Sequence, residues 1–144
     1  MTPDDLQQAL DRLPHGAEFR FLDRLTKLVP GQSGDGEYRV RGDGPFLRGH
    51  FPGQPIFPGV LLTEAAAQLA GVVAQSDPAI APLRNLKLAA MRNVKILGTA
   101  KPGETILLEA TVTARMGNLI QAHATARVGT ETVLTAELTL SGNQ

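Results

Sequence analysis

The sequence contains no cysteine. This absence excludes disulfide bonds, thiol nucleophiles and thiolate metal ligands from any account of the protein. An excess of charge of one sign is missing as well, because 14 basic and 14 acidic residues give a formal net charge of zero. The overall charge balance therefore provides no reason to expect a nucleic acid or a membrane surface as a partner.

The chain also lacks the hydrophobic runs that insertion into a membrane requires. Residues 1–5 are acidic rather than a basic start to an apolar run, so no signal peptide is visible. No apolar segment is both long and uninterrupted enough to span a bilayer. We therefore expect a cytoplasmic protein. At 144 residues and 15.3 kDa it should form one domain over residues 1–144, with a single continuous core.

Hydrophobic periodicity predicts two helices and a set of strands. The predicted elements are a helix over residues 2–13 with Thr2 as N-cap, a strand over 19–29, a polar turn over 30–36, a strand over 37–41, a helix over 58–75 and a strand over 83–97 with an interruption near 89–91. Plain alternation marks the last third of the chain. Its predicted inward residues are Ile106, Leu108, Ala110, Val112 and Ala114, then Ile120, Ala122, Ala124 and Ala126, then Leu134, Ala136, Leu138 and Leu140.

The stretch from residue 49 to residue 75 organises the rest of the chain. It begins as a loop stiffened by three prolines and then becomes a helix that is almost entirely apolar or alanine, and such a helix is buried on most sides. The polar residues Glu64, Gln68 and Gln75 lie within about 40° of one another around that helix. This line of polar groups is either an exposed helix edge or the polar side of a reaction site.

Two residues in this stretch could supply acid–base chemistry. His50 lies on the rigid loop, and a histidine with its unperturbed pKa of about 6.5 can accept a proton at neutral pH. A carboxyl group in apolar surroundings can keep its proton, which would make Glu64 the acid. At the helix start, Pro58 suits the first helical position and Phe57 offers no oxygen to cap the helix. The free N–H groups there could hold an oxygen that gains negative charge.

The same stretch carries a specific resemblance to a known family. One run of residues closely resembles the signature of the FabZ-type 3-hydroxyacyl-[acyl-carrier-protein] dehydratases, which have the hotdog fold. This run is His50-Phe51-Pro52-Gly53-x-Pro55-x-x-Pro58-Gly59-Val60-Leu61-x-x-Glu64-Ala65-x-Ala67-Gln68. Thinner matches are Leu13-Pro14-His15, Phe19, Asp23-Arg24 and Pro102-Gly103-Glu104. The related FabA-type enzymes usually carry Asp where this chain has Glu64, so the resemblance favours the FabZ type.

The resemblance implies a fold and an assembly. The fold would be an α+β hotdog, in which a curved antiparallel sheet wraps around a long central helix. Composition alone also allows a flatter α+β layer. Members of the family are dimers, often assembled into trimers of dimers, so we expect a homodimer and, as an alternative, a hexamer. Their active sites lie at the dimer interface, where His50 of one copy would meet Glu64 of the other.

The resemblance also implies a reaction. The substrate would be a 3-hydroxyacyl chain on the phosphopantetheine arm of an acyl carrier protein, with no cofactor and no metal. His50 would remove the proton at C2, and Glu64 would protonate the departing C3 hydroxyl. The substrate-binding residues would be Gly59, whose amide would hold the thioester oxygen, together with Gln68, Phe51, Phe57 and Val60. Gln68 would orient the carboxyl of Glu64 or a water, or would simply be a satisfied helix amide.

The other two histidines are weighed separately. His15 adjoins Pro14 at the end of the first predicted helix, and we interpret it as structural, with a role near the site as the alternative. His123 shares its strand face with polar residues and should be exposed. No pair of histidines has the spacing of metal ligands together with a carboxylate, so no metal site is predicted.

A basic segment could bind the carrier protein. No acidic residue lies between Asp77 and Glu104. The basic residues in this interval are Arg84, Lys87, Arg92, Lys95 and Lys101. Carrier proteins of this pathway are acidic, so these side chains could steer one to the site. The alternative is a solvated strand face with no partner.

The chain departs from the family pattern at residues 16–18 and 94–101. These positions help to line the acyl tunnel in the family, so the acyl chain length and the pathway, housekeeping or specialised, stay open. Three alternative functions also stay open. They are an acyl thioesterase of the hotdog fold, an enoyl-CoA hydratase of that fold, and a non-catalytic hotdog protein that binds acyl carriers.

Overall fold

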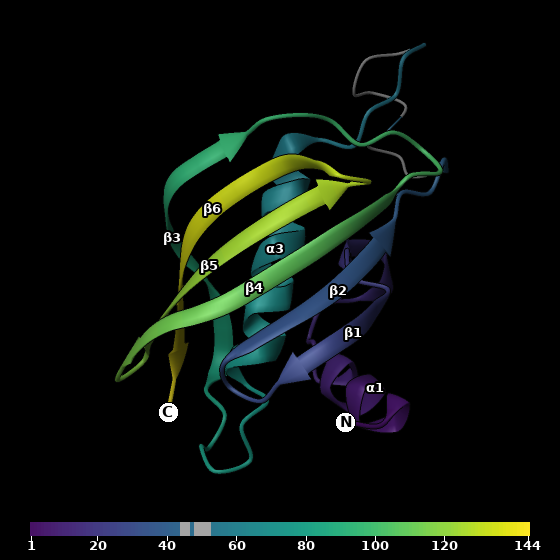
Figure 1. The fold of residues 1–144 in the computed structure, drawn as a ribbon. Helices are drawn as coiled ribbons and strands as arrows, with labels where there is room; N and C mark the ends of the chain where they lie inside the picture. The colour runs from purple at the N-terminus through teal and green to yellow at the C-terminus, as the bar shows by residue number, and fades with distance from the viewer. Residues whose placement is uncertain (44–46, 48–52) are drawn as a thin grey trace.

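The computed structural model describes residues 1–43, 47 and 53–144 (Figure 1). Within these ranges, helical elements with defined bounds are α1 (Pro3–Asp11), a short 3₁₀ turn η1 (Ala17–Phe19) and α3 (Gly59–Ala74). The strands are β1 (Arg24–Val29), β2 (Ser33–Arg39), β3 (Arg84–Ile96), β4 (Thr105–Met116), β5 (Leu119–Val128) and β6 (Glu131–Asn143).

The strands form one antiparallel sheet of six strands in the order β1-β2-β4-β5-β6-β3. Figure 1 shows this sheet curving around α3, with α1 beside the β1–β2 end. The three long C-terminal strands follow one another as hairpins, as the alternation of the last third predicts. The chain therefore has a curved sheet around one long helix.

Helix α3 is buried because its side chains are small and apolar. Ala65, Ala66, Leu69, Ala70 and Val73 have no measurable exposure. The element runs from Gly59 to Ala74, with residue 58 as N-cap and residue 75 as C-cap, so the predicted helix over 58–75 is confirmed to within one residue at each end.

The predicted polar turn over residues 30–36 is wrong in its second half. Strand β2 begins at Ser33, and Gly34 and Gly36 lie inside it and face the core. A Cβ atom on Gly34 would lie 2.8 Å from Val73 of α3, and one on Gly36 would lie 2.6 Å from Leu22. These glycines thus let β2 approach the core closely, a requirement that outweighs their usual preference for turns.

The predicted strand over residues 19–29 begins five residues too early. Its first part is the end of η1 and an irregular segment, and regular pairing starts at Arg24. The irregular segment is held by a side chain of α3, since the backbone N–H of Phe21 donates to Gln68 Oε1 at 2.8 Å. This tertiary contact replaces a strand partner for that part of the chain.

Irregularities in two strands change which side chains face inward. The pairing of β3 shifts between Leu88 and Ala90, which confirms the predicted interruption near 89–91. The pairing of β4 shifts between Val112 and Ala114, so the prediction that Ala114 faces inward is wrong and this residue is exposed. After a bulge the faces exchange, and Arg115 instead donates from Nη2 to Ala74 O at 2.6 Å.

The predicted first helix is confirmed as α1. Thr2 is its N-cap and forms a capping box with Asp5, whose carboxylate accepts from the Thr2 backbone at 3.0 Å. Leu10 and Leu13 are buried against the core at its C-terminal end. Over the described ranges 1–43, 47 and 53–144, no helix has both the length and the hydropathy needed to cross a membrane.

Candidate active site

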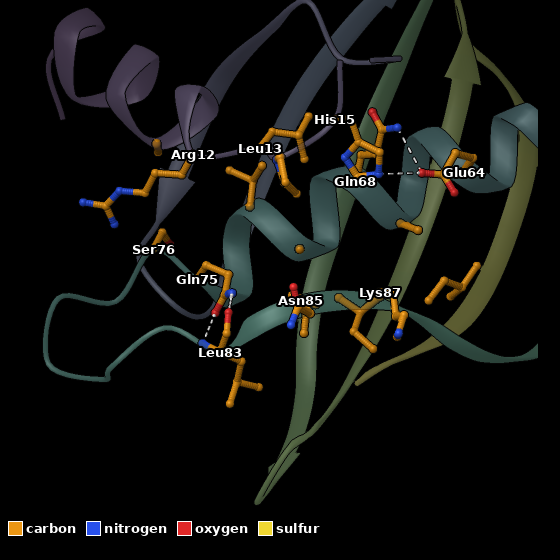
Figure 2. A pocket seen from close by; sticks show the side chains of 18 residues that line it. Arg12, Leu13, His15, Glu64, Gln68, Gln75, Ser76, Leu83, Asn85 and Lys87 are labelled. Atoms are coloured by element: carbon orange, nitrogen blue, oxygen red, sulfur yellow. Dashed lines mark hydrogen bonds and ion pairs between the residues drawn. The ribbon is translucent and has the colours of Figure 1, made fainter. Parts of the chain in front are cut away.

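Glu64 projects from the second turn of α3 and is partly exposed at the edge of a cavity. Its Oε2 accepts a hydrogen bond from Gln68 Nε2 at 3.0 Å and lies 3.4 Å from His15 Nε2 (Figure 2). Its Oε1 has no hydrogen-bond partner among the described residues. The carboxyl group is thus held through one oxygen while the other remains available.

Gln68 lies one turn beyond Glu64 and is 2 % exposed. Besides its bond to Glu64, its Nε2 donates to Phe19 O at 2.8 Å, and its Oε1 accepts from Phe21 N at 2.8 Å. Because a backbone N–H can only donate and a carbonyl can only accept, the side-chain amide has a single possible orientation. Gln68 therefore ties the segment before β1 to α3 and presents an N–H to Glu64.

His15 lies beside Glu64, which favours the alternative we gave for it, a place near the site. The N–O contact of 3.4 Å brings its ring to the same carboxyl oxygen that Gln68 contacts. The ring stacks on Phe19, with centroids 6.2 Å apart, and within the described part of the chain its buried Nδ1 has no hydrogen-bond partner. Its place in the family-like stretch Leu13-Pro14-His15 was the signal that could have identified it.

The cavity beside Glu64 has a volume of about 570 Å³. It is lined by one stripe of α3, by residues 9–15 of the N-terminal segment and by the first half of β3. The predicted polar line is confirmed, because Glu64, Gln68 and Gln75 all line it. The other lining residues on α3 are small or apolar, so the cavity combines an apolar body with a few polar groups, as ligand sites do.

The start of α3 has no side-chain cap, as predicted. Pro58 is the N-cap, and its carbonyl accepts from Leu61 N at 2.9 Å and Leu62 N at 3.1 Å. The preceding N–H groups, of Gly59 and Val60, have no acceptor among the described residues. A Cβ on Gly59 would lie 2.8 Å from the end of the Ile96 side chain of β3, so a larger residue at position 59 would require that side chain to shift.

The remaining predicted substrate-binding residues lie elsewhere or outside the described ranges. Phe57 is 1 % exposed in the core, with its ring 5.6 Å from those of Phe21 and Tyr38, and it does not line the cavity. Val60 is 72 % exposed and does not line it either. The predicted base His50 and the predicted contact Phe51 lie outside the described residues.

The predicted carrier-binding residues are all exposed. Four of them, Arg84, Lys87, Arg92 and Lys95, lie on β3, and Lys101 follows that strand. Lys87 also lines the cavity, and Arg84 donates to Gln144 O at 2.6 Å. His123 is exposed on β5, as predicted.

Comparisons with known proteins agree on one family and one fold. The model of the FabA-like domain matches residues 13–137. Two relatives described as 3-hydroxyacyl-[acyl-carrier-protein] dehydratase FabZ are 35 % and 36 % identical over 126 residues. The first comes from Caldanaerobacter subterraneus, and its match covers 88 % of this chain and 89 % of the relative. The second comes from Clostridioides difficile, and its match covers 88 % of each chain. A third, from Chloroflexus aggregans, is 34 % identical over 133 residues, 92 % of each chain.

Two solved structures share the architecture at low sequence identity. The dehydratase heterocomplex ApeI:P from Xenorhabdus doucetiae matches with a TM-score of 0.78 and 19 % identity, over 94 % of this chain and 91 % of that one. Thioesterase superfamily member 2 of zebra fish matches with a TM-score of 0.74 and 16 % identity, over 99 % of each. The predicted α+β hotdog fold is thereby confirmed.

Proposed function

The chain belongs to the FabA-like domain family, and we propose that it dehydrates (3R)-3-hydroxyacyl-acyl-carrier-protein to trans-2-enoyl-acyl-carrier-protein and water in fatty-acid or related acyl-chain biosynthesis. The protein is a hydro-lyase on this assignment. The observation that carries the proposal is a single carboxyl group, Glu64, held on a buried helix at the edge of an apolar cavity.

The reaction requires a base at C2 and an acid at C3. His50 would take the proton from C2, the C2–C3 double bond would form, and the C3–O bond would break as Glu64 protonates the leaving hydroxyl to water. The free amide at Gly59 would hold the thioester oxygen while negative charge builds on it. General acid and base groups each contribute about 10²–10⁴-fold to rate.

The hydrogen bonds of Gln68 support a specific role for each oxygen of Glu64. The fixed amide of Gln68 presents an N–H to Oε2, and the better acceptor in a protonated carboxyl group is its carbonyl oxygen, so this bond favours Oε2 as the carbonyl oxygen. We infer that a protonated Glu64 carries its proton on Oε1, the oxygen without a partner among the described residues. Gln68 would act as a positioning residue that aims Oε1 at the leaving group.

The proposed assembly is a homodimer, with a trimer of dimers as the larger alternative. Strand β3 supports it, because this edge strand is 13 residues long and leaves most of its side chains exposed. Met91 and Ile96 on it are more than half exposed, as is Leu97 just beyond it. A long exposed edge with apolar side chains favours pairing with another strand. In the proposed dimer, His50 of one copy would face Glu64 of the other.

The proposed substrate carrier is an acyl carrier protein, and the exposed basic residues of β3 would attract its acidic surface. Reversing the charge of Arg92 and Lys95, which lie on β3 and do not line the cavity, tests this role. We expect a higher KM for carrier-linked substrate and an unchanged KM for the pantetheine-linked one. Equal effects on both substrates would remove the docking assignment without affecting the dehydratase assignment.

The dehydratase assignment is tested with purified protein and a 3-hydroxyacyl thioester, by following the absorbance of the conjugated enoyl product. The His50→Ala and Glu64→Gln variants should lose activity by at least about 10²-fold and remain folded by circular dichroism. Release of the free acid instead of the enoyl thioester would identify a thioesterase. A preference for coenzyme A over carrier-linked substrate would identify an enoyl-CoA hydratase.

A further inference from the structure

The cavity ends at a clamp between α3 and the segment before β3. Gln75 follows the last residue of α3, and its Nε2 donates to Leu83 O at 2.7 Å. The Leu83 N–H donates back to Gln75 Oε1 at 3.1 Å. A side-chain amide that makes both bonds to one residue is fixed in orientation, and it closes the loop over residues 76–82.

Gln75 lies far from Glu64 along the same helix, with Gln68 between them (Figure 2). Gln75 lies eleven positions after Glu64, which corresponds to about 16 Å along an α-helix. The cavity-lining residues on this side of the protein begin at Glu64 and end at Ser76, directly beyond Gln75. The clamp therefore lies at the end of the cavity opposite the carboxyl group.

The walls of the cavity between these two ends are mainly apolar, with Arg12, Asn85 and Lys87 as polar members. Its walls include Leu13, Ala67, Val72, Leu86, Leu88 and Leu140. Gly71 leaves additional room in the middle, since a Cβ there would meet its nearest atoms, on Leu86 and Leu140, only at 3.7 and 4.0 Å. An aliphatic chain lying here would gain affinity with each methylene group, by about fourfold, which is the equivalent of ~0.8 kcal/mol.

At the clamp this gain stops. A further methylene group would have to displace an amide that already makes two hydrogen bonds, or remain in contact with polar groups. Ser76, beside the clamp, is likewise engaged, because its Oγ donates to Val73 O at 2.7 Å and accepts from Gly31 N at 3.0 Å. Polar groups that are bonded to the protein resist displacement by an apolar group.

We propose that Gln75 is a specificity-determining residue whose clamp on Leu83 sets the upper limit of acyl chain length. This inference rests on the proposed function, since it places the acyl chain of the substrate along α3 with C3 at Glu64. The limit depends on the combination of a Gln that reaches Leu83 and a Gly at position 71.

The test measures kcat/KM for a series of pantetheine-linked 3-hydroxyacyl thioesters of increasing chain length. For the wild-type protein, kcat/KM should rise by up to about fourfold per methylene group and then fall beyond one length. In Gln75→Ala the maximum should move to longer chains by two or more methylene groups, while the shortest substrates react within about twofold of wild type. Gln121→Ala, on the exposed face of β5, is the matched control and should leave the profile unchanged.

A second variant moves the limit in the opposite direction. Gly71→Val fills the middle of the cavity, so its maximum should lie at shorter chains than that of the wild type. An unchanged maximum in Gln75→Ala, or an equal loss at every chain length, would overturn the role of the clamp. An unchanged maximum in Gly71→Val would show that the acyl chain does not lie here. Absence of dehydration at all lengths in wild type would instead overturn the proposed function.

Discussion

Replacing Gln68 with leucine should reduce both the stability and the catalytic rate of the protein. The substitution keeps the volume of the side chain but removes three hydrogen bonds, to Phe19 O, Phe21 N and Glu64 Oε2. The bond from Phe21 is buried, and removing a partner from a buried polar group costs about 1–3 kcal/mol. The other two bonds are partly buried and contribute less, so we expect a total loss of about 2–4 kcal/mol in the free energy of unfolding.

The catalytic effect should be separable from this loss of stability. Without the amide, Glu64 loses the donor that directs its Oε1, and we expect kcat to fall by about tenfold or more with a smaller change in KM. Gln68→Glu is the informative partner variant, because a carboxylate at position 68 would place a negative charge against Glu64 and Phe19 O. It should be less active than Gln68→Leu at neutral pH and should recover partly as the pH falls and the new carboxyl gains a proton.

Equilibrium urea unfolding followed by circular dichroism measures the stability change, since the chain has no tryptophan to report on unfolding. Rates are measured at a temperature where each variant is fully folded. Gln121→Leu on the exposed face of β5 is the control for a loss of amide at the surface and should change neither quantity. A Gln68→Leu protein within 0.5 kcal/mol and twofold of wild type would refute the role of Gln68.

Three further substitutions test other parts of the structure. The pKa of Asp35 is raised by burial and by Glu109, which lies directly opposite it on the neighbouring strand. The folded state therefore binds this proton more tightly, and the wild type loses stability as pH rises through the raised pKa. Asp35→Asn should have a free energy of unfolding about 0.2–1 kcal/mol higher than wild type at pH 7, and this difference should vanish below the ordinary carboxyl pKa. A difference in stability that stays constant at every pH would contradict this account. Arg115→Ala should lower the free energy of unfolding in urea by about 1–2 kcal/mol, because Arg115 donates a hydrogen bond to the carbonyl of Ala74 at the negative end of α3. Arg115→Lys should recover part of this stability, and an unchanged stability in Arg115→Ala would contradict a stabilising role for the Arg115 bond. His15→Phe keeps an aromatic ring at that position but removes the nitrogen beside the carboxyl group of Glu64. We expect kcat to fall by about fivefold with an unchanged melting temperature, and an unchanged kcat would show that His15 is purely structural.

The central helix and its polar line could be predicted from the sequence because both depend on local periodicity. An apolar helix with Glu64, Gln68 and Gln75 at helical spacing has one polar line wherever it lies, and that line faces the cavity. The hairpins of the last third were equally predictable from alternation with period two. Among the residues of these strands that we predicted to face inward, only Ala114 is wrong, because it lies beyond a bulge that alternation does not reveal.

Features that depend on distant contacts could not be predicted in this way. Gly34 and Gly36 are typical of a turn, and their position in β2 follows from how closely that strand approaches the core. Gln68 contacts the backbone of Phe19, 49 positions earlier, and no local pattern specifies such a contact. For the same reason His15 could not be placed beside Glu64 by spacing.

The core position of Phe57 also depends on distant residues. Its ring packs with Phe21 and Tyr38, which belong to parts of the chain that sequence periodicity treats as unrelated. The family-like run makes every apolar residue next to the helix a candidate for substrate contact. The structure separates Phe57, which is in the core, from the residues that line the cavity.

Pairing two inactive variants in one oligomer tests most directly whether His50 and Glu64 of different copies form one site. His50→Ala and Glu64→Gln, each carrying a different affinity tag, are produced together and compared with each variant alone. Each alone should be inactive, but in a random mixture half of the dimers contain both variants and have one intact site of two, so about a quarter of wild-type activity should return. A mixture that contains both tags in one oligomer and stays as inactive as its parents would contradict a site shared between two copies.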